Sequence, residues 1–220
     1  RLLPASEPMR VKVKICGVKT PDALVATLSA GADAVGFNFY APSPRALSLE
    51  DARGLGARAP HLMKVGVFVD ADDSLLDAAV RAAGLNAIQL QGAEGPERVA
   101  ALKARFGLPV WKAVGVRTAA DIASASRRYA DADLLLLDAK PPEGAVLTGG
   151  NGLRFDWRIL DEARPSLPWA LAGGLTAETV GEAIARTGAP MVDVASGVED
   201  APGIKSVAKI AAFVEAARRA

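Results

Sequence analysis

The sequence predicts an α/β protein that folds as a single (β/α)8 barrel, and three observations support this fold. From residue 11 onward, short apolar runs rich in β-branched residues alternate with Ala-rich amphipathic stretches. Eight such pairs fit into about 210 residues, at the lower end of the size range of these barrels. A weak repeat recurs about every 50 residues, close to two strand–helix units; it reads GADAVGF, GLNAIQL, YADADLLLL and GAPMVDV.

The predicted elements follow one another in strict alternation. We expect strands at VKVKIC (11–16), AVGFNFY (34–40), LMKVGVFVD (62–70), AIQLQ (87–91), PVWKAV (109–114), LLLLD (134–138), PWALAG (168–173) and MVDVAS (191–196). We expect helices at TPDALVATLSAG (20–31), SLEDARGLGARA (48–59), SLLDAAVRAAG (74–84), GPERVAALKARFG (95–107), TAADIASASRRYA (118–130), FDWRILDEA (155–163), TAETVGEAIARTG (176–188) and GIKSVAKIAAFVEAARRA (203–220). Helix signals agree, since Thr20 is a good N-cap and Gly31 a good C-terminal cap, and we expect Asp70 to cap the third helix.

A doubly wound open sheet is the alternative fold. It usually has fewer strands and a glycine fingerprint after the first one, whereas KICGVKTPD at residues 14–22 contains no G-x-G-x-x-G. No linker divides the chain, so residues 11–220 are expected to form one catalytic TIM-type barrel domain. Residues 1–10 are expected to be an N-terminal extension, with Met9 as a candidate natural start.

The composition argues against several kinds of partner. The 26 basic and 25 acidic residues are mixed along the chain, and the formal net charge is +1. The sequence has no stripe of basic residues of the kind that is typical of nucleic-acid-binding proteins. It also has no apolar run long enough to predict a membrane partner. We therefore expect a small-molecule substrate and a chain that is a monomer or a homodimer. The single cysteine allows no internal disulfide, which favours a cytoplasmic location.

In such barrels the chemistry lies at the C-terminal ends of the strands, which makes Cys16 and Asp138 candidate catalytic residues. Asp138 ends a run of four leucines, where apolar surroundings would keep a carboxyl protonated and able to act as an acid. Cys16 ends the first strand, and its thiol would act as a base if nearby cations favoured the thiolate. A capping aspartate and a buried core thiol are the alternative interpretations. His61 precedes the third strand, at the opposite end of the barrel.

Small residues after the last two strands predict a phosphate site. Bare backbone N–H groups and helix N-termini bind phosphate, and such sites follow strands 7 and 8 of these barrels. The candidates here are Gly173, Gly174, Ser196 and Gly197. A tight turn would explain one such glycine pair, but two adjacent strand ends carry them. Asp193 and Gln89 lie on strands that end at the same face and are predicted to contact substrate.

A proline-stiffened loop after the second strand carries Arg45, whose guanidinium could hold a carboxylate with two hydrogen bonds. A solvated loop arginine is the alternative.

The motifs together resemble one known family. These motifs are KICGVKT, F-x5-R ending in SPR (39–45), VGVFVD, IQLQG, LLLLDAK followed by GGNGLRFDW, LAGGL and DVASGVE. In this order and spacing they resemble phosphoribosylanthranilate isomerase of tryptophan biosynthesis, over about residues 11 to 215. Each motif alone is weak, whereas the set is specific.

The resemblance implies an isomerase that carries out an Amadori rearrangement without a metal or organic cofactor. Its substrate is N-(5'-phosphoribosyl)anthranilate, and its product is 1-(2-carboxyphenylamino)-1-deoxyribulose 5-phosphate. By the same resemblance, Cys16 is the general base, Asp138 is the general acid and Arg45 binds the anthranilate carboxylate. The glycines of LAGGL and the Ser-Gly of ASGVE hold the phosphate.

This sequence departs from the family pattern at three places. Gln91 stands where a histidine is usual, Asn151 where a threonine is usual, and Thr179 where an asparagine is usual. We expect Gln91 to change affinity rather than to abolish activity. None of the three positions is Cys16, Asp138 or Arg45.

Other functions remain open from the sequence. A related aminoaldose–ketose isomerase, such as that of histidine synthesis, typically uses aspartates on strands 1 and 5, where this chain has Cys16 and Lys112. A non-catalytic phosphometabolite-binding barrel would bind phosphate without turnover. A redox sensor built on Cys16 would respond to oxidation.

Overall fold

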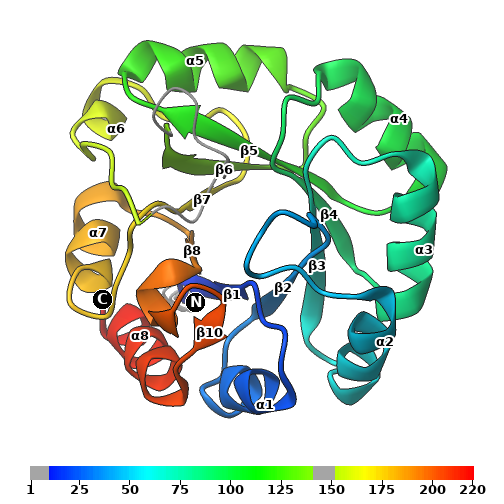
Figure 1. The fold of residues 1–220 in the computed structure, drawn as a ribbon. Helices are drawn as coiled ribbons and strands as arrows, with labels where there is room; N and C mark the ends of the chain where they lie inside the picture. Colours follow the sequence, from blue (N-terminus) through cyan, green and yellow to red (C-terminus); the bar gives the residue numbers. More distant parts are fainter. Residues whose placement is uncertain (1–9, 141–151) are drawn as a thin grey trace, which may run out of the picture.

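The computed structural model describes residues 10–140 and 152–220, and these form the predicted barrel. Eight parallel strands close in chain order, with β8 pairing back to β1. Figure 1 looks along the barrel and shows the helices as an outer ring around the strands. The strands are β1 (Lys12–Cys16), β2 (Ala34–Asn38), β3 (Met63–Phe68), β4 (Ala87–Leu90), β5 (Val110–Val116), β6 (Leu134–Ala139), β7 (Trp169–Leu171) and β8 (Met191–Val194).

The helices cover the outside of the strands, and most of them begin where the sequence predicts. They are α1 (Pro21–Ser29), α2 (Leu49–Arg58), α3 (Asp73–Ala83), α4 (Pro96–Phe106), α5 (Ala119–Arg128), α6 (Ile159–Glu162), α7 (Val180–Thr187) and α8 (Val207–Arg219). Thr20 caps α1 as expected, because its side chain accepts a hydrogen bond from the Ala23 N–H. Among these helices, no span is both long and apolar enough to cross a membrane.

The internal repeat has a physical cause in hydrogen bonds between neighbouring strands. Asp33, Asn86 and Asp133 each precede an even-numbered strand. Each side chain accepts a hydrogen bond from the backbone N–H of a residue near the start of the preceding strand, at 2.7 to 2.9 Å. In three of the four repeats, one polar side chain thus joins the N-terminal ends of two neighbouring strands, whereas the fourth repeat has Pro190 at this position.

Apolar side chains pack in two layers. The larger cluster lies between strands and helices and includes residues such as Val13, Ile15 and Phe213. The smaller cluster contains only residues at or beside the strands, such as Val65, Trp111 and Leu136. Since side chains on a strand alternate between its two faces, this smaller cluster fills the barrel interior.

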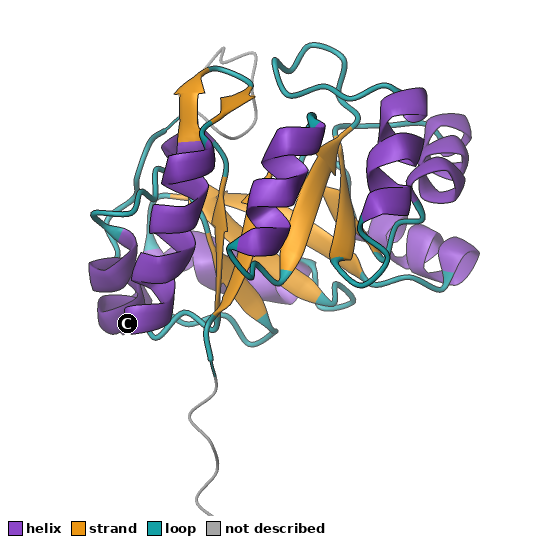
Figure 2. Cartoon of the chain, turned by 90° about the horizontal axis from the view of Figure 1, so that it is seen from below, coloured by secondary structure: helices purple, strands orange, loops and turns teal. Residues whose placement is uncertain are grey.

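Several predicted helix boundaries in the last third of the chain are wrong. The helix predicted at 155–163 forms only the single turn α6, and α7 begins at Val180 rather than at 176. The last helix was predicted to begin at 203, but residues 204–205 form β10 (Ile204–Lys205), which pairs with β9 (Glu199–Ala201). The short 3-10 helix η1 (Ser196–Val198) precedes this hairpin. Figure 2 shows this hairpin protruding at one end of the barrel. A short antiparallel pairing overrides helix propensity here.

The prediction that Asp70 caps the third helix is also wrong. The side chain of Asp72 caps α3 by accepting from the Leu75 N–H. Asp70 has a φ of 47°, and its carboxylate accepts a hydrogen bond from the Ala93 N–H instead. It therefore joins the loop after β3 to the loop after β4.

Candidate active site

Two adjoining pockets at the C-terminal ends of the strands contain all of the predicted site residues. One is lined by Cys16, Arg45, Gln89, Asp138 and Asp193, together with neighbouring side chains. The second is lined by Asp138 and Asp193 again and by the predicted phosphate-binding residues, which are Gly173, Gly174, Ser196 and Gly197. Because the pockets share two carboxylates, one extended ligand can occupy both. Exposed His61 lies before β3, at the other end of the barrel, as predicted.

Cys16 ends β1 with its side chain inside the barrel and only 8% exposed. It is paired in register with Gly36 of β2, and a methyl group on Gly36 would lie 2.8 Å from the Cys16 Sγ. A glycine at this position therefore leaves the space that the thiol occupies. Burial raises the pKa of the Cys16 thiol, while the positive charges of Lys14 and Lys205 act in the opposite direction.

Asp138 lies near the end of β6, with its side chain facing the barrel interior. Burial raises its pKa to about 7; the Ala139 N–H, which donates to Oδ1 at 2.8 Å, favours the charged form but only partly offsets the effect. The negative charge of Asp193 adds to the increase and Lys14 opposes it. The carboxyl is thus about half protonated near neutral pH, as a general acid requires.

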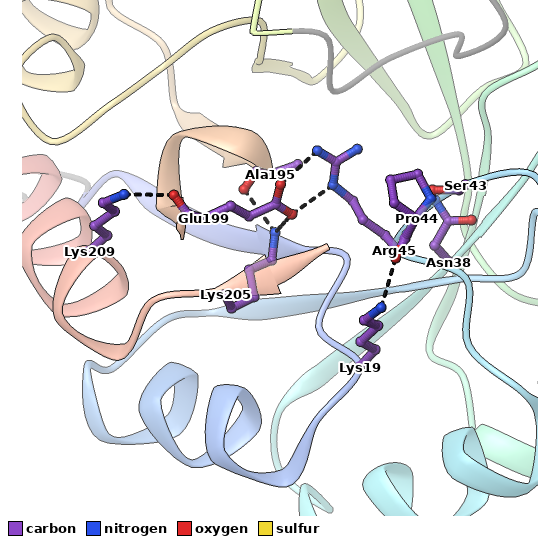
Figure 3. Close-up of polar contacts among 9 residues, drawn as sticks. All are labelled: Lys19, Asn38, Ser43, Pro44, Arg45, Ala195, Glu199, Lys205 and Lys209. Atoms are coloured by element: carbon purple, nitrogen blue, oxygen red, sulfur yellow. Dashed lines mark hydrogen bonds and ion pairs between the residues drawn. The ribbon is translucent and has the colours of Figure 1, made fainter. Parts of the chain in front are cut away.

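Arg45 is buried, and the carboxylate of Glu199 holds its guanidinium. Its Nε donates to Glu199 Oε1 at 2.8 Å, and its Nη2 donates to Oε2 at 2.9 Å. Lys205 also contacts Glu199 Oε1 at 2.8 Å and donates to the Ala195 carbonyl. Figure 3 shows Glu199 between the two cations. Arg45 thus lines the pocket as predicted, in an orientation set by the hairpin that follows β8.

The loop that carries Arg45 is tied to neighbouring elements. The Ser43 hydroxyl accepts from the Arg45 N–H at 3.2 Å, and Lys19 donates to the Pro44 carbonyl at 2.8 Å. Figure 3 draws the contact from Lys19, and the two contacts together hold the loop over the end of β2. The guanidinium is therefore placed by both its backbone and its ion pair.

Bare backbone lines the glycine pocket. Gly173 and Gly174 follow β7 with φ angles of 89° and 61°, which favour glycine and allow successive N–H groups to converge. A methyl group on Gly197 would lie 1.8 Å from the Leu175 carbonyl oxygen. Side chains at these positions would close the pocket, so its shape depends on bare backbone.

Gln89 presents an acceptor to the larger pocket. The side chain is 1% exposed, and its Nε2 donates to Gln91 Oε1 at 2.8 Å. Among the described residues no donor reaches its Oε1. Because buried polar atoms are normally hydrogen-bonded, this oxygen is suited to accept a hydrogen bond from a ligand. Gln91 thus orients Gln89.

Asn151, the second departure from the family pattern, lies outside the described residues.

Sequence reasoning missed Lys14, Glu199 and Lys205. Lys14 is completely buried and its Nζ donates to Asp193 Oδ1 at 2.8 Å. It is two residues from Cys16, so strand alternation already placed both on one face. A signal for Glu199 existed, because it belongs to the ASGVE motif. Lys205 had no such signal, because it lay in a segment that was predicted to be a helix. In the described part of the chain, no three His, Cys, Asp or Glu side chains are grouped to hold a metal.

Comparisons with known proteins identify the family of the chain. The family model of N-(5'phosphoribosyl)anthranilate (PRA) isomerase matches residues 13–216. The N-(5'-phosphoribosyl)anthranilate isomerase of Cereibacter sphaeroides is 53% identical over 209 residues, covering 94% of this chain and 99% of the relative.

Solved structures agree as well. The crystal structure of phosphoribosyl anthranilate isomerase from Thermotoga maritima superimposes with a TM-score of 0.83 at 38% identity, covering 96% of this chain and all of that one. Another crystal structure, of a phosphoribosyl anthranilate isomerase in complex with reduced 1-(o-carboxyphenylamino)-1-deoxyribulose 5-phosphate, has a TM-score of 0.80 at 36% identity, with the same coverage. The chain therefore belongs to the N-(5'-phosphoribosyl)anthranilate isomerase family.

Proposed function

We propose that this chain carries out the Amadori rearrangement of N-(5'-phosphoribosyl)anthranilate with Asp138 as general acid and Cys16 as general base. The observation that supports this proposal most is that Asp138 and Cys16 line the same pocket. A carboxyl whose pKa is about 7 and a buried thiol line one pocket, and this pocket adjoins the pocket lined by the glycines. One acid and one base are sufficient for this reaction.

In the first step Asp138 donates its proton to the ribose ring oxygen. The bond between C1' and that oxygen breaks, and the nitrogen lone pair forms a Schiff base with C1'. The Cys16 thiolate then removes the proton on C2', and the electron pair of that bond neutralises the iminium nitrogen. The enolamine product becomes the ketone when its 2'-hydroxyl loses a proton and C1' gains one. The burial that raises the pKa of Asp138 therefore serves the first step.

The two pockets suggest how the substrate is oriented. The phosphate would lie at the Gly173–Gly174 turn and the Ser196–Gly197 backbone. The ribose would lie beside Asp138 and Asp193, which both pockets share. The anthranilate ring would then point toward Arg45 and Gln89, where a guanidinium faces its carboxylate. In this orientation Cys16, which lines the same pocket as Asp138, is the candidate to remove the proton on C2'.

The test is to generate phosphoribosylanthranilate in situ and to follow the loss of anthranilate-type fluorescence. We expect fast loss with the unaltered protein and a decrease in kcat of about a hundredfold or more with Cys16→Ala or Asp138→Asn. Asp131→Asn removes an exposed carboxylate and is the matched control. Turnover near normal in either site variant would refute that residue's role. Phosphate binding by the folded protein without any turnover would favour a binding barrel instead.

A further inference from the structure

Lys14 is a buried charge in the middle of the site. Its side chain has no exposed surface, and its Nζ is 2.8 Å from Asp193 Oδ1. Burial lowers the pKa of Lys14, but the charges and hydrogen bonds of Asp193 and Cys16 act in the opposite direction, and the net result is a raised pKa. The ammonium is therefore charged across the neutral range. Burying such a charge is costly unless it is paired, and Asp193 supplies the partner.

The Lys14 and Cys16 side chains meet over one glycine. Both point into the barrel from β1, and Gly36 of β2 lies against them. A methyl group on Gly36 would be 2.8 Å from the Cys16 Sγ and 3.2 Å from the Lys14 Cε. The two side chains thus share the space that a larger residue would fill. Lys14 also acts on the thiol through its charge and a side-chain hydrogen bond.

The proposed reaction needs the deprotonated form of Cys16, so a group that stabilises this thiolate would favour the reaction. The acid, Asp138, loses its proton near pH 7, while burial raises the pKa of Cys16. A form with the proton on Asp138 and none on Cys16 is then a minor fraction of the molecules at every pH. Any group that favours the thiolate raises this fraction directly.

We propose that Lys14 is a positioning residue that stabilises the thiolate of Cys16, and that Asp193 holds the Lys14 ammonium in place for this purpose. The proposal rests on the role of Cys16 as the base. It gives Asp193 a function besides substrate contact, because its carboxylate anchors the cation that the thiolate needs.

Other charged groups around Cys16 are already paired with one another. From β10, Lys205 donates to Glu199 at 2.8 Å, and Glu199 also binds Arg45. From β6, Asp138 adds no charge while it is protonated. From β8, Asp193 raises the pKa of the thiol through its negative charge. Lys14 pairs instead with Asp193, which lines the same pocket as the thiol, and the charges of Lys14 and Asp193 have opposite effects on the pKa of Cys16.

The single cysteine of the chain makes the test direct. The ultraviolet absorbance of the thiolate, taken as the difference from Cys16→Ser, reports on Cys16 alone as pH is varied. We expect Lys14→Met to raise the midpoint of this titration by about one pH unit or more, or about tenfold less thiolate at a given pH below it. We expect Lys14→Gln to raise the midpoint as well, because it removes the same positive charge while it keeps a polar side chain beside Asp193.

Lys112→Met is the matched control, since Lys112 is also a buried strand lysine, paired with Glu94 at 3.1 Å. It should leave the midpoint where it is. An unmoved midpoint in Lys14→Met, or an equal shift in Lys112→Met, would overturn the proposal. If circular dichroism shows that Lys14→Met does not fold, the titration of Lys14→Gln is used instead, and an unmoved midpoint in that variant overturns the proposal.

Activity provides a separate readout. In Lys14→Met the limb of the kcat/KM profile that reports the base should move to higher pH together with the thiolate midpoint. The absorbance titration needs no turnover, so it tests the role of Lys14 even if Cys16→Ala remains active. Retained turnover in Cys16→Ala would refute the role of Cys16 as the base. The absorbance titration would still decide whether Lys14 stabilises the thiolate.

Discussion

Replacing Asp138 with asparagine should make the protein more stable at alkaline pH while it abolishes activity. The folded-state pKa of Asp138 is about 7, against an ordinary value of 3.8. The folded chain therefore holds this proton more tightly than the unfolded chain, and stability falls as pH rises from about 3.8 to about 7. Asparagine resembles the protonated side chain and its oxygen can keep the hydrogen bond from the Ala139 N–H, which is 2.8 Å long.

The magnitude follows from the separation of the two pKa values. Each pH unit is worth about 1.4 kcal/mol, so the full penalty on the ionised carboxyl is about 4 kcal/mol. The advantage of Asp138→Asn should be about 2 kcal/mol near pH 5 and about 4 kcal/mol near pH 8. The growth between the two pH values is the robust quantity, because it cancels effects of the substitution that do not depend on pH.

Urea unfolding followed by circular dichroism at both pH values measures this difference. Asp131→Asn, which changes an exposed aspartate, controls for loss of a surface charge. An advantage that is the same at both pH values, or larger near pH 5, would show that Asp138 is ionised in the folded protein. Its assignment as the general acid would then fail.

Three further substitutions test the site. Gly36→Ala should lower kcat and cost about 1 to 3 kcal/mol of stability, because the new methyl group would lie 2.8 Å from the Cys16 Sγ; kcat and stability close to those of the unaltered protein would contradict this geometry. Glu199→Gln should cost about 3 to 5 kcal/mol and raise KM, because Arg45 and Lys205 lose a buried carboxylate. Asp200→Asn on the same hairpin breaks only an exposed pair with Lys209 and should cost less than about 1 kcal/mol, so equal losses in urea unfolding would refute the special role of Glu199. Gly197→Ala should weaken inhibition by inorganic phosphate, since its methyl group would collide with the Leu175 carbonyl; unchanged inhibition would remove Gly197 from the phosphate site.

Sequence patterns predicted the barrel because each signal is local. The apolar runs that form β1 to β8 can be recognised without knowing their neighbours, and parallel strands joined by helices close in chain order. The same logic placed Cys16 and Asp138 at the C-terminal face, because a strand end in such a barrel always lies there. The start of α8 was less predictable, because the pairing of β9 with β10 overrides local helix propensity.

The sequence by itself thus determined the fold, the face that carries the chemistry and the residue types available there. Only the tertiary structure decided how these residues are partnered. Lys14 and Asp193 are 179 positions apart, and Arg45 and Glu199 are 154 apart, so no local pattern predicts either ion pair. The raised pKa of Asp138 likewise depends on burial by distant segments. Charge interactions and desolvation depend on distance in space, which only the closed barrel defines.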